Sequence, residues 1–351
     1  MLANKSSSPA GQNAVSEVTI DLPLKILVYK NGRIEGVLRS PFVPASEDPG
    51  ITGVATRDAV VDRETGVAAR LFLPTRAVIT GRRLSLVVFF HGGSLIAAAE
   101  SAFCQTYHRY ATSLAARAGA IVVSVEYRLP SEHPTTAAHD DAWNALRWAA
   151  SLADPWLLYH ADRRCTFLAG DGAGGDIAYR TAVRASRAGD DIDVEGLLLM
   201  DPYFWEPGWL PHEKAGHGGF LTPAEIAQLP CRRALVAVAE KGAGVRERGR
   251  RLAARMRGCW WGGEVTIVEL HGEDHGFHLY GPASAGTERL MESIVEFVNK
   301  ERDQSSMLRD KKEVPSGVLD GAEVAPSLSN GSRMKAVPVD VPRRTMTKSC
   351  L

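Results

Sequence analysis

The stretch Gly170–Asp171–Gly172–Ala173–Gly174 has the spacing of a nucleophile turn but lacks a nucleophile. In the pattern G-x-S-x-G, a serine occupies a sharp turn between a strand and a helix, where its hydroxyl meets the substrate. Here the flanking glycines are present and the central residue is Gly172. Glycine-rich turns of this kind also cradle phosphates. That alternative requires the first βαβ unit and a later ribose-binding acid, and this turn lies mid-chain.

Backbone groups that could stabilise the oxygen of an acyl substrate follow the apolar run at 85–90. His91, Gly92 and Gly93 come directly after it, and two glycines allow the backbone to turn with its N–H groups pointing outward. Fixed N–H donors can stabilise a developing oxyanion. The alternative is an ordinary Gly-Gly turn. We expect Gly92 and Gly93 to be candidate oxyanion donors.

A candidate base lies in the segment 271–278, which contains three histidines. Hydrolases with this type of nucleophile turn, called the elbow below, carry their catalytic histidine late in the chain, after the last strand. Clustered histidines can also form a surface loop or a metal site, but no helical HExxH frame is present. We therefore expect the base to be a histidine of this segment, with no metal and no cofactor.

The acid that would orient this base is missing where it is expected. It should follow the strand at 233–240, where the sequence continues through Gly242 and Gly244 without a carboxylate. Glu240 is nearby but belongs to the end of the strand. The sequence thus predicts a histidine with no carboxylate to set its tautomer.

The elements that must position these groups alternate between strand and helix. Short apolar runs predict strands at 25–30, 70–74, 85–90, 120–127, 165–170, 195–201, 233–240 and 264–270. Helical patterns occupy 104–118, 138–152, 174–188, 245–257 and 284–300. This alternation predicts a mainly parallel sheet covered by helices on both sides. Ligands then bind beyond the carboxyl ends of the strands, in the loops after 90, 127, 170, 201, 240 and 270.

Composition argues against some classes of binding partner and indicates the cellular compartment. The chain has 351 residues, 41 basic and 41 acidic, so no basic field favours nucleic acid. No apolar run predicts a membrane span or a secretory signal, and five scattered cysteines predict a reducing compartment. We expect a cytoplasmic protein, with the nucleus as a second compartment. The expected organisation is a disordered segment at 1–19, one domain at 20–300 and a disordered tail at 301–351.

These loops, in this order, resemble the plant carboxylesterase family of α/β-hydrolases, the class related to hormone-sensitive lipase. The marks are FFHGGS, VVSVEYRLPSEHP, FLAGDGAGGDIAY, DPYFW, VAEKGAGVRERG and GEDHGFHLY. The resemblance implies an α/β-hydrolase fold with a small cap, partly built by a short segment at 205–222. It also implies an oxyanion hole at Gly92 and Gly93 completed by the Ala173 N–H, with His275 as base.

The departures from that family leave three hypotheses open. The elbow serine is replaced by Gly172 and the acid by Gly242. The first hypothesis is a protein with weak or no ester hydrolysis that binds a small molecule. The second is an active ester hydrolase or dehydratase-type lyase that uses His275 and the oxyanion hole. The third is a hormone binder similar to the gibberellin receptors. Ser94 and Cys104 are conceivable substitute nucleophiles.

Overall fold

A computed structural model describes residues 18–22, 26–29, 34–36, 40–79, 81–93, 101–129, 133–189, 192–204 and 222–300. The expected tail at 301–351 and the cap segment at 205–221 lie outside these ranges, as do residues 1–17 of the expected N-terminal segment. Residues 18 and 19 begin a strand, β1, so structure starts slightly earlier than the sequence predicted.

An eight-stranded sheet organises the chain, and its order is β11-β10-β9-β8-β6-β7-β5-β4. The strands are β4 (Val54–Val60), β5 (Ala68–Pro74), β6 (Leu84–Phe90), β7 (Ile121–Glu126), β8 (Ala161–Asp171), β9 (Gly196–Met200), β10 (Arg233–Ala239) and β11 (Glu264–Leu270). β5 runs antiparallel to both of its neighbours, and the remaining pairs are parallel. The expected mainly parallel sheet is confirmed. A separate antiparallel sheet contains β1 (Val18–Leu22), β2 (Ile26–Tyr29) and β3 (Ile34–Gly36).

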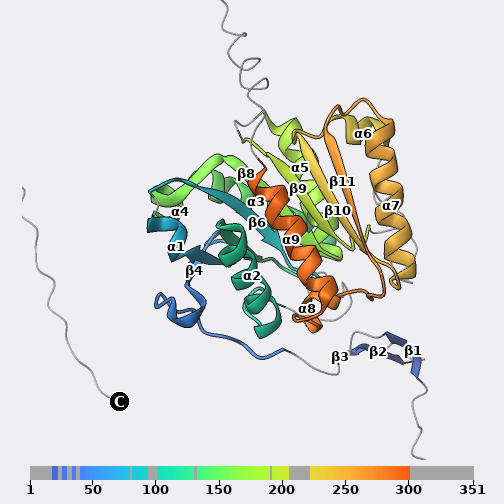
Figure 1. The fold of residues 1–351 in the computed structure, drawn as a ribbon, viewed down its shortest axis with the longest axis horizontal. Helices are drawn as coiled ribbons and strands as arrows, with labels where there is room; N and C mark the ends of the chain where they lie inside the picture. Colours follow the sequence, from blue (N-terminus) through green and yellow to red (C-terminus); the bar gives the residue numbers. More distant parts are fainter. Residues whose placement is uncertain are drawn as a thin grey trace, which may run out of the picture. The chain divides into compact units, whose positions relative to one another are not determined.

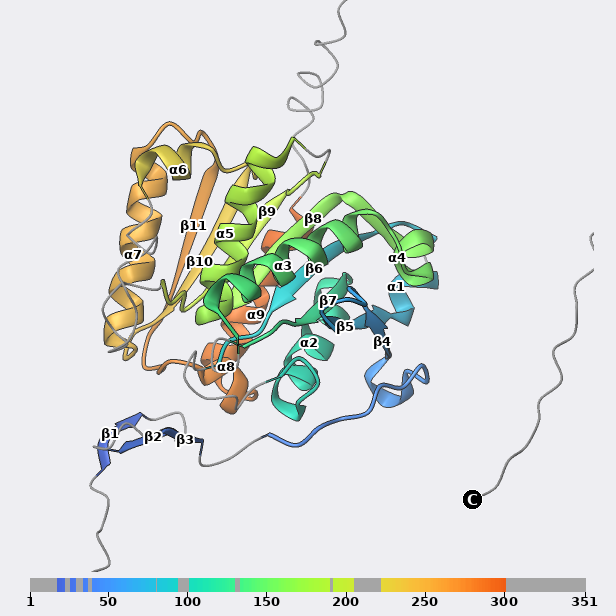
Figure 2. The ribbon, with the colours of Figure 1, turned by 180° about the vertical axis from the view of Figure 1, so that it is seen from behind.

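Helices cover both faces of the large sheet (Figures 1 and 2). α2 (Gln105–Ala118) and α9 (Ala285–Asn299) pack on one face, and α3 (Thr135–Ala150), α5 (Ala173–Ala188) and α7 (Ala243–Gly258) pack on the other. Short helices complete the set: η1 (Gly50–Thr52), α1 (Thr75–Ile79), α4 (Pro155–His160), α6 (Pro223–Ala227) and α8 (Phe277–Tyr280). No helix in the described ranges has the length and apolar character needed to cross a membrane.

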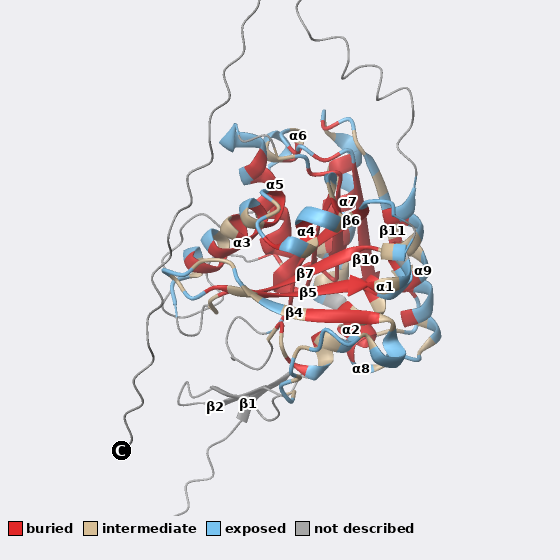
Figure 3. Ribbon diagram, turned by 90° about the vertical axis from the view of Figure 1, so that its left-hand side faces the viewer, coloured by how far each residue is buried: buried red, intermediate tan, exposed pale blue. Residues whose placement is uncertain are grey.

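The strand β6 shows why its sequence forms a central strand. Its side chains alternate between the two faces. Val88 and Phe90 join the core beneath α3 and α5, whereas Val87 and Phe89 join the core beneath α2 and α9. All four are fully buried, in agreement with the burial of the strands in Figure 3. A run that is apolar on both faces is therefore stable only in the middle of a covered sheet.

The register brings the carboxyl ends of the central strands to one edge. Phe90 pairs with Gly170, Asp171 pairs with Met200, and Ala239 pairs with Leu270. The loops after β6, β8, β9, β10 and β11 consequently begin next to one another. This edge is where the sequence predicts the functional groups.

Candidate functional site

Gly172 forms the turn between β8 and α5. Its φ of 55° and ψ of −115° lie outside the regions that residues with side chains commonly adopt. The Gly172 N–H donates to the Met200 carbonyl at 2.9 Å, and the Tyr203 N–H donates to the Gly172 carbonyl at 2.8 Å. These two bonds hold the turn against the loop after β9.

The flanking glycines are needed because strand and helix meet without room for a side chain. A Cβ on Gly170 would lie 2.0 Å from the Gly174 carbonyl oxygen, and a Cβ on Gly174 would lie 2.0 Å from the Phe90 carbonyl oxygen. Both distances are far below van der Waals contact, and the neighbouring atoms are backbone. The tight strand-to-helix turn inferred from the glycine spacing is therefore present.

The centre of the turn faces His275. A Cβ built on Gly172 would lie 3.6 Å from Cε1 and 3.7 Å from Nε2 of His275, which is ordinary contact. Among the described residues, no other atom beyond the turn comes within 4 Å of that point. The structure thus brings together the substituted nucleophile position and the predicted base.

His275 has a carboxylate partner that the sequence reasoning missed. Its Nδ1 lies 3.3 Å from Oδ2 of Asp201, the first residue after β9. A carboxylate can only accept, so Nδ1 carries the proton and Nε2 of the neutral ring is left as an acceptor toward Gly172. The expectation that no carboxylate would set the tautomer was wrong, because the acid comes from a different strand end.

Gly242, the position where the sequence analysis expected the acid, lies next to His275 and offers no carboxylate. A Cβ on Gly242 would be 3.6 Å from the Cβ of His275. Glu240 serves another purpose, because its Oε2 accepts the Gly272 N–H at 2.7 Å and its Oε1 lies 3.5 Å from His271. The loop after β10 is adjacent to the base but contributes no acid to it.

The electrostatic surroundings favour a charged His275. Burial alone would lower the pKa of its imidazole, but the hydrogen bond to Asp201 and the charges of Asp171, Asp201 and Asp274 outweigh burial and raise the pKa. The side chain stays 27% exposed, so a ligand can reach the ring. A histidine that is more basic than usual and faces an open position is suited to taking up a proton.

The backbone donors expected for an oxyanion hole differ in what they contact. The Gly92 N–H donates to the Tyr107 hydroxyl oxygen at 2.8 Å, which differs from the expectation, because an N–H bonded to a buried side chain is not aimed at a ligand. Gly93 is exposed, with a φ of 116°. Ala173 is the first residue of α5, where helix geometry provides no internal acceptor for its N–H.

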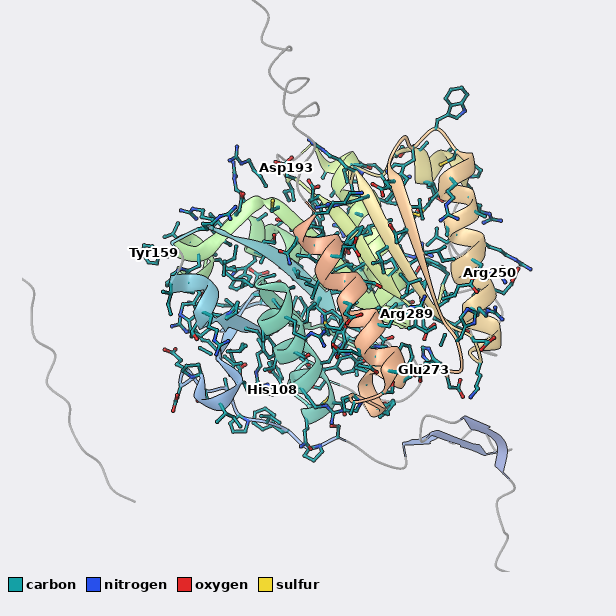
Figure 4. All side chains as sticks on the ribbon, in the orientation of Figure 1. His108, Tyr159, Asp193, Arg250, Glu273 and Arg289 are labelled. Carbon is teal, nitrogen blue, oxygen red and sulfur yellow. The ribbon has the colours of Figure 1, made fainter. Side chains whose placement is uncertain are left out.

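The three histidines of the 271–278 segment lie in different environments. His271 is exposed beside Glu240, His275 faces Gly172, and His278 is buried, with its Nε2 3.6 Å from Oδ1 of Asp171. Burial lowers the pKa of His278. Glu273, labelled in Figure 4, lies in the loop that carries His271 and His275, whereas His278 lies in α8. No cluster in the described residues has three side chains placed to hold a metal ion.

Of the two substitute nucleophiles considered from the sequence, the structure describes Cys104 alone, and it does not join this group. Cys104 is buried and forms the N-cap of α2. Ser94 lies outside the described residues. Cys104 therefore does not supply a thiol at the position opposite Nε2 of His275.

Comparison with known proteins places this geometry in a family. A family model described as "alpha/beta hydrolase fold" matches residues 87–229. The chain is 34% identical over 319 residues to probable carboxylesterase 1 of Arabidopsis thaliana, covering 82% of this chain and 99% of the relative. The chain belongs to the plant carboxylesterase family. It is also 32% identical to 2-hydroxyisoflavanone dehydratase of Glycyrrhiza echinata, with 83% of this chain and 99% of the relative covered.

Solved structures agree with the α/β-hydrolase fold of this carboxylesterase-family chain. A hyperthermophilic esterase from the archaeon Pyrobaculum calidifontis is 25% identical, with a TM-score of 0.57, and the match covers 74% of this chain and 84% of that structure. The predicted fold is confirmed. The sequence analysis expected functional groups beyond the carboxyl ends of the strands. Asp201 fits that rule as a candidate, since it is a carboxylate at the end of a buried strand next to the elbow strand.

Proposed function

We propose that this carboxylesterase-family chain binds a small molecule or ester beside Gly172 and His275 and hydrolyses esters weakly or not at all. The observation that carries the proposal is the space in front of Nε2, where the family reaction needs a hydroxyl and this chain has a bare backbone. Without that hydroxyl, the acyl-enzyme route has no first step. In a serine protease, the same loss costs on the order of a million-fold in kcat.

The remaining groups still suit binding of an acyl compound. The N–H groups of Gly93 and Ala173 would serve as donors to a carbonyl oxygen, and the Gly92 N–H would brace the turn from within. Oxyanion donors and binding alone can leave about 10³–10⁴-fold acceleration over water. Weak turnover of activated esters is therefore compatible with a site whose main activity is binding.

A second candidate function is direct attack by water, or elimination, with His275 as base. The contact between His275 and Asp201 favours it, because an oriented and basic imidazole can activate a small nucleophile. In hydrolysis, Nε2 would take a proton from water as the water oxygen bonds to the acyl carbon. The proton would then pass to the leaving alkoxide as the ester bond breaks. A dehydratase among the relatives adds support for elimination.

The deciding experiment compares wild type, Gly172→Ser and His275→Ala on short p-nitrophenyl esters. The proposal expects negligible wild-type turnover and no stoichiometric adduct with a fluorophosphonate probe. It also expects an adduct and measurable turnover in Gly172→Ser, because the new Oγ would come within reach of Nε2. Ordinary esterase rates in wild type that disappear in His275→Ala would overturn the binding proposal in favour of the second candidate.

Binding is measured separately from turnover. Adding a p-nitrophenyl ester to ¹⁵N-labelled wild-type protein should shift the His275 resonances in a saturable way. His271, which is exposed and lies beside Glu240, is the internal control. Equal, non-saturating shifts at both histidines would contradict a site at His275.

A further inference from the structure

We propose that Asp201 is the positioning acid of this site, and that this role has moved from the loop after β10 to the end of β9. The proposal rests on the proposed function only in taking His275 as the base. It concerns how the ring is held, so it can be tested whether or not the protein turns over a substrate.

The first argument is the contact itself. Oδ2 of Asp201 lies 3.3 Å from Nδ1 of His275, on the side of the ring opposite the Nε2 that faces Gly172. An orienting acid has this arrangement, because it fixes the tautomer that leaves Nε2 free to accept a proton. Among the described residues, Asp201 is the carboxylate that this ring contacts.

The second argument is that the Asp201 carboxylate is held in place. Its side chain is 2% exposed, and its Oδ1 accepts the Ala239 N–H at 2.7 Å. Its own N–H donates to the Ala237 carbonyl at 2.8 Å. Two bonds to β10 therefore aim one oxygen at the strand and leave the other for His275. Fixed geometry of this kind distinguishes a positioning group from an incidental neighbour.

The third argument is the backbone of Asp201. Its φ is 42°, a positive value shared by one other non-glycine residue in the described ranges, Leu152. Such conformations are unfavourable for residues with side chains and persist where the surrounding structure imposes them, often at functional sites. Here the bonds of Gly172 to Met200 and Tyr203 impose it, because they tie the residues on either side of Asp201 and Pro202 to the elbow. The unusual backbone conformation of Asp201 thus lies where the elbow meets the residue that contacts His275.

The other charged groups around His275 do not occupy this position. Asp171 is bonded to Tyr107, and Asp274 accepts the backbone N–H of His275 rather than its ring. His278 is buried behind the site. Gly242, next to the His275 Cβ, has no side chain to offer. The ring therefore has one described orienting partner, and it comes from β9.

The test is a ¹⁵N NMR titration of His275 in the full chain. Wild type should show a neutral ring with the proton on Nδ1. In Asp201→Asn, the amide would donate to Nδ1, so the ring proton should move to Nε2. The pKa of His275 should also fall, because the hydrogen bond and the charge of Asp201 both raise it in wild type. The control Asp274→Asn removes a nearby charge but no ring contact, and it should keep the Nδ1–H tautomer.

A restoring variant separates orientation from general structural damage. Adding Gly242→Asp to Asp201→Asn places a carboxylate beside His275 from the loop after β10, and it should return the Nδ1–H tautomer and raise the pKa again. An unchanged tautomer and pKa in Asp201→Asn would overturn the proposal. If that variant does not fold, the wild-type spectrum decides alone, since an Nε2–H tautomer there would also overturn it. None of these outcomes depends on esterase activity.

Discussion

The Tyr107 hydroxyl joins the two strand-end loops that flank the site: it donates to Oδ2 of Asp171 at 2.9 Å and accepts the Gly92 N–H at 2.8 Å. Tyr107 comes from α2, Asp171 ends β8, and Gly92 follows β6. One buried oxygen therefore fixes the glycine turn against the elbow strand, and both partners would be left unsatisfied without it.

We expect Tyr107→Phe to lower the free energy of unfolding by about 1–3 kcal/mol, because it leaves a buried N–H and a buried carboxylate oxygen without this partner. Tyr110→Phe is the matched control. The Tyr110 hydroxyl is also buried on α2, but it donates to the thioether sulfur of Met200, a weak acceptor. Urea denaturation of both variants measures the difference. An equal loss in the two would contradict the role given to Tyr107.

Gly174→Ala should destabilise the protein severely, because the added Cβ would meet the Phe90 carbonyl oxygen at 2.0 Å. Gly244→Ala is a matched substitution at the second residue of α7, where a Cβ has no neighbour within 4 Å. That change should be neutral or stabilise by up to about 1 kcal/mol, since alanine favours helix more than glycine does. Thermal denaturation distinguishes the two. A Gly174→Ala variant that melts with wild type would refute the close packing of β6 and α5.

Gly172→Ala tests the backbone strain of the elbow apart from any clash. Gly172 and Gly119 both have positive φ, and a Cβ at either position meets no close obstacle. Gly119 has a ψ of 35°, inside the left-handed region, whereas Gly172 has a ψ of −115°. We expect Gly119→Ala to cost about 1–2 kcal/mol and Gly172→Ala to cost more, up to about 3 kcal/mol. The reverse order in chemical denaturation would be inconsistent with this geometry.

Asp176 gives a pH-dependent prediction. Burial raises the pKa of this carboxyl, and the Arg180 guanidinium at 2.8 Å only partly offsets that effect. A group whose pKa is raised by folding contributes stability below its unfolded pKa and loses it as the pH rises through the folded value. Asp176→Asn should therefore gain stability relative to wild type as the pH increases from about 4 to 7.

The control for this prediction is Asp140→Asn, which removes an exposed ion pair with Arg184. Such surface pairs contribute at most about 1 kcal/mol. Urea midpoints of both variants and wild type, measured at several pH values, provide the comparison. An advantage of Asp176→Asn that stays constant with pH would show that burial of the charge is not its cause.

The sequence was sufficient to predict the strands and helices with strong local patterns, but it was not sufficient for the edge strand β4. The strand predicted at 85–90 is β6, and the helix predicted at 174–188 is α5, because continuous apolar runs and helical spacing are strong local signals. The edge strand β4 was not predicted. Its second half begins with the charged residues Arg57 and Asp58 and alternates between partly buried and exposed positions, so it lacks the apolar run that marks a buried strand.

Candidate residues at single strand ends could be predicted from the sequence. Contacts between residues of two different strand ends could not. His275, Gly172 and Gly242 were placed by their order along the chain, and the structure brings them together. The Asp201 contact depends on how β9 aligns with β10 and β11, which is a three-dimensional relationship. The bond from Gly92 to Tyr107 was missed for the same reason, since 15 residues separate them.

Under the proposed function, the glycine at position 172 would change what limits the time that a ligand stays at the site. An esterase empties its site by hydrolysing the bound ester and releasing an acid and an alcohol. A chain with no group to start that cycle would release the ligand intact, so occupancy would follow the surrounding concentration reversibly. The same site would then respond to the concentration of that compound instead of consuming it.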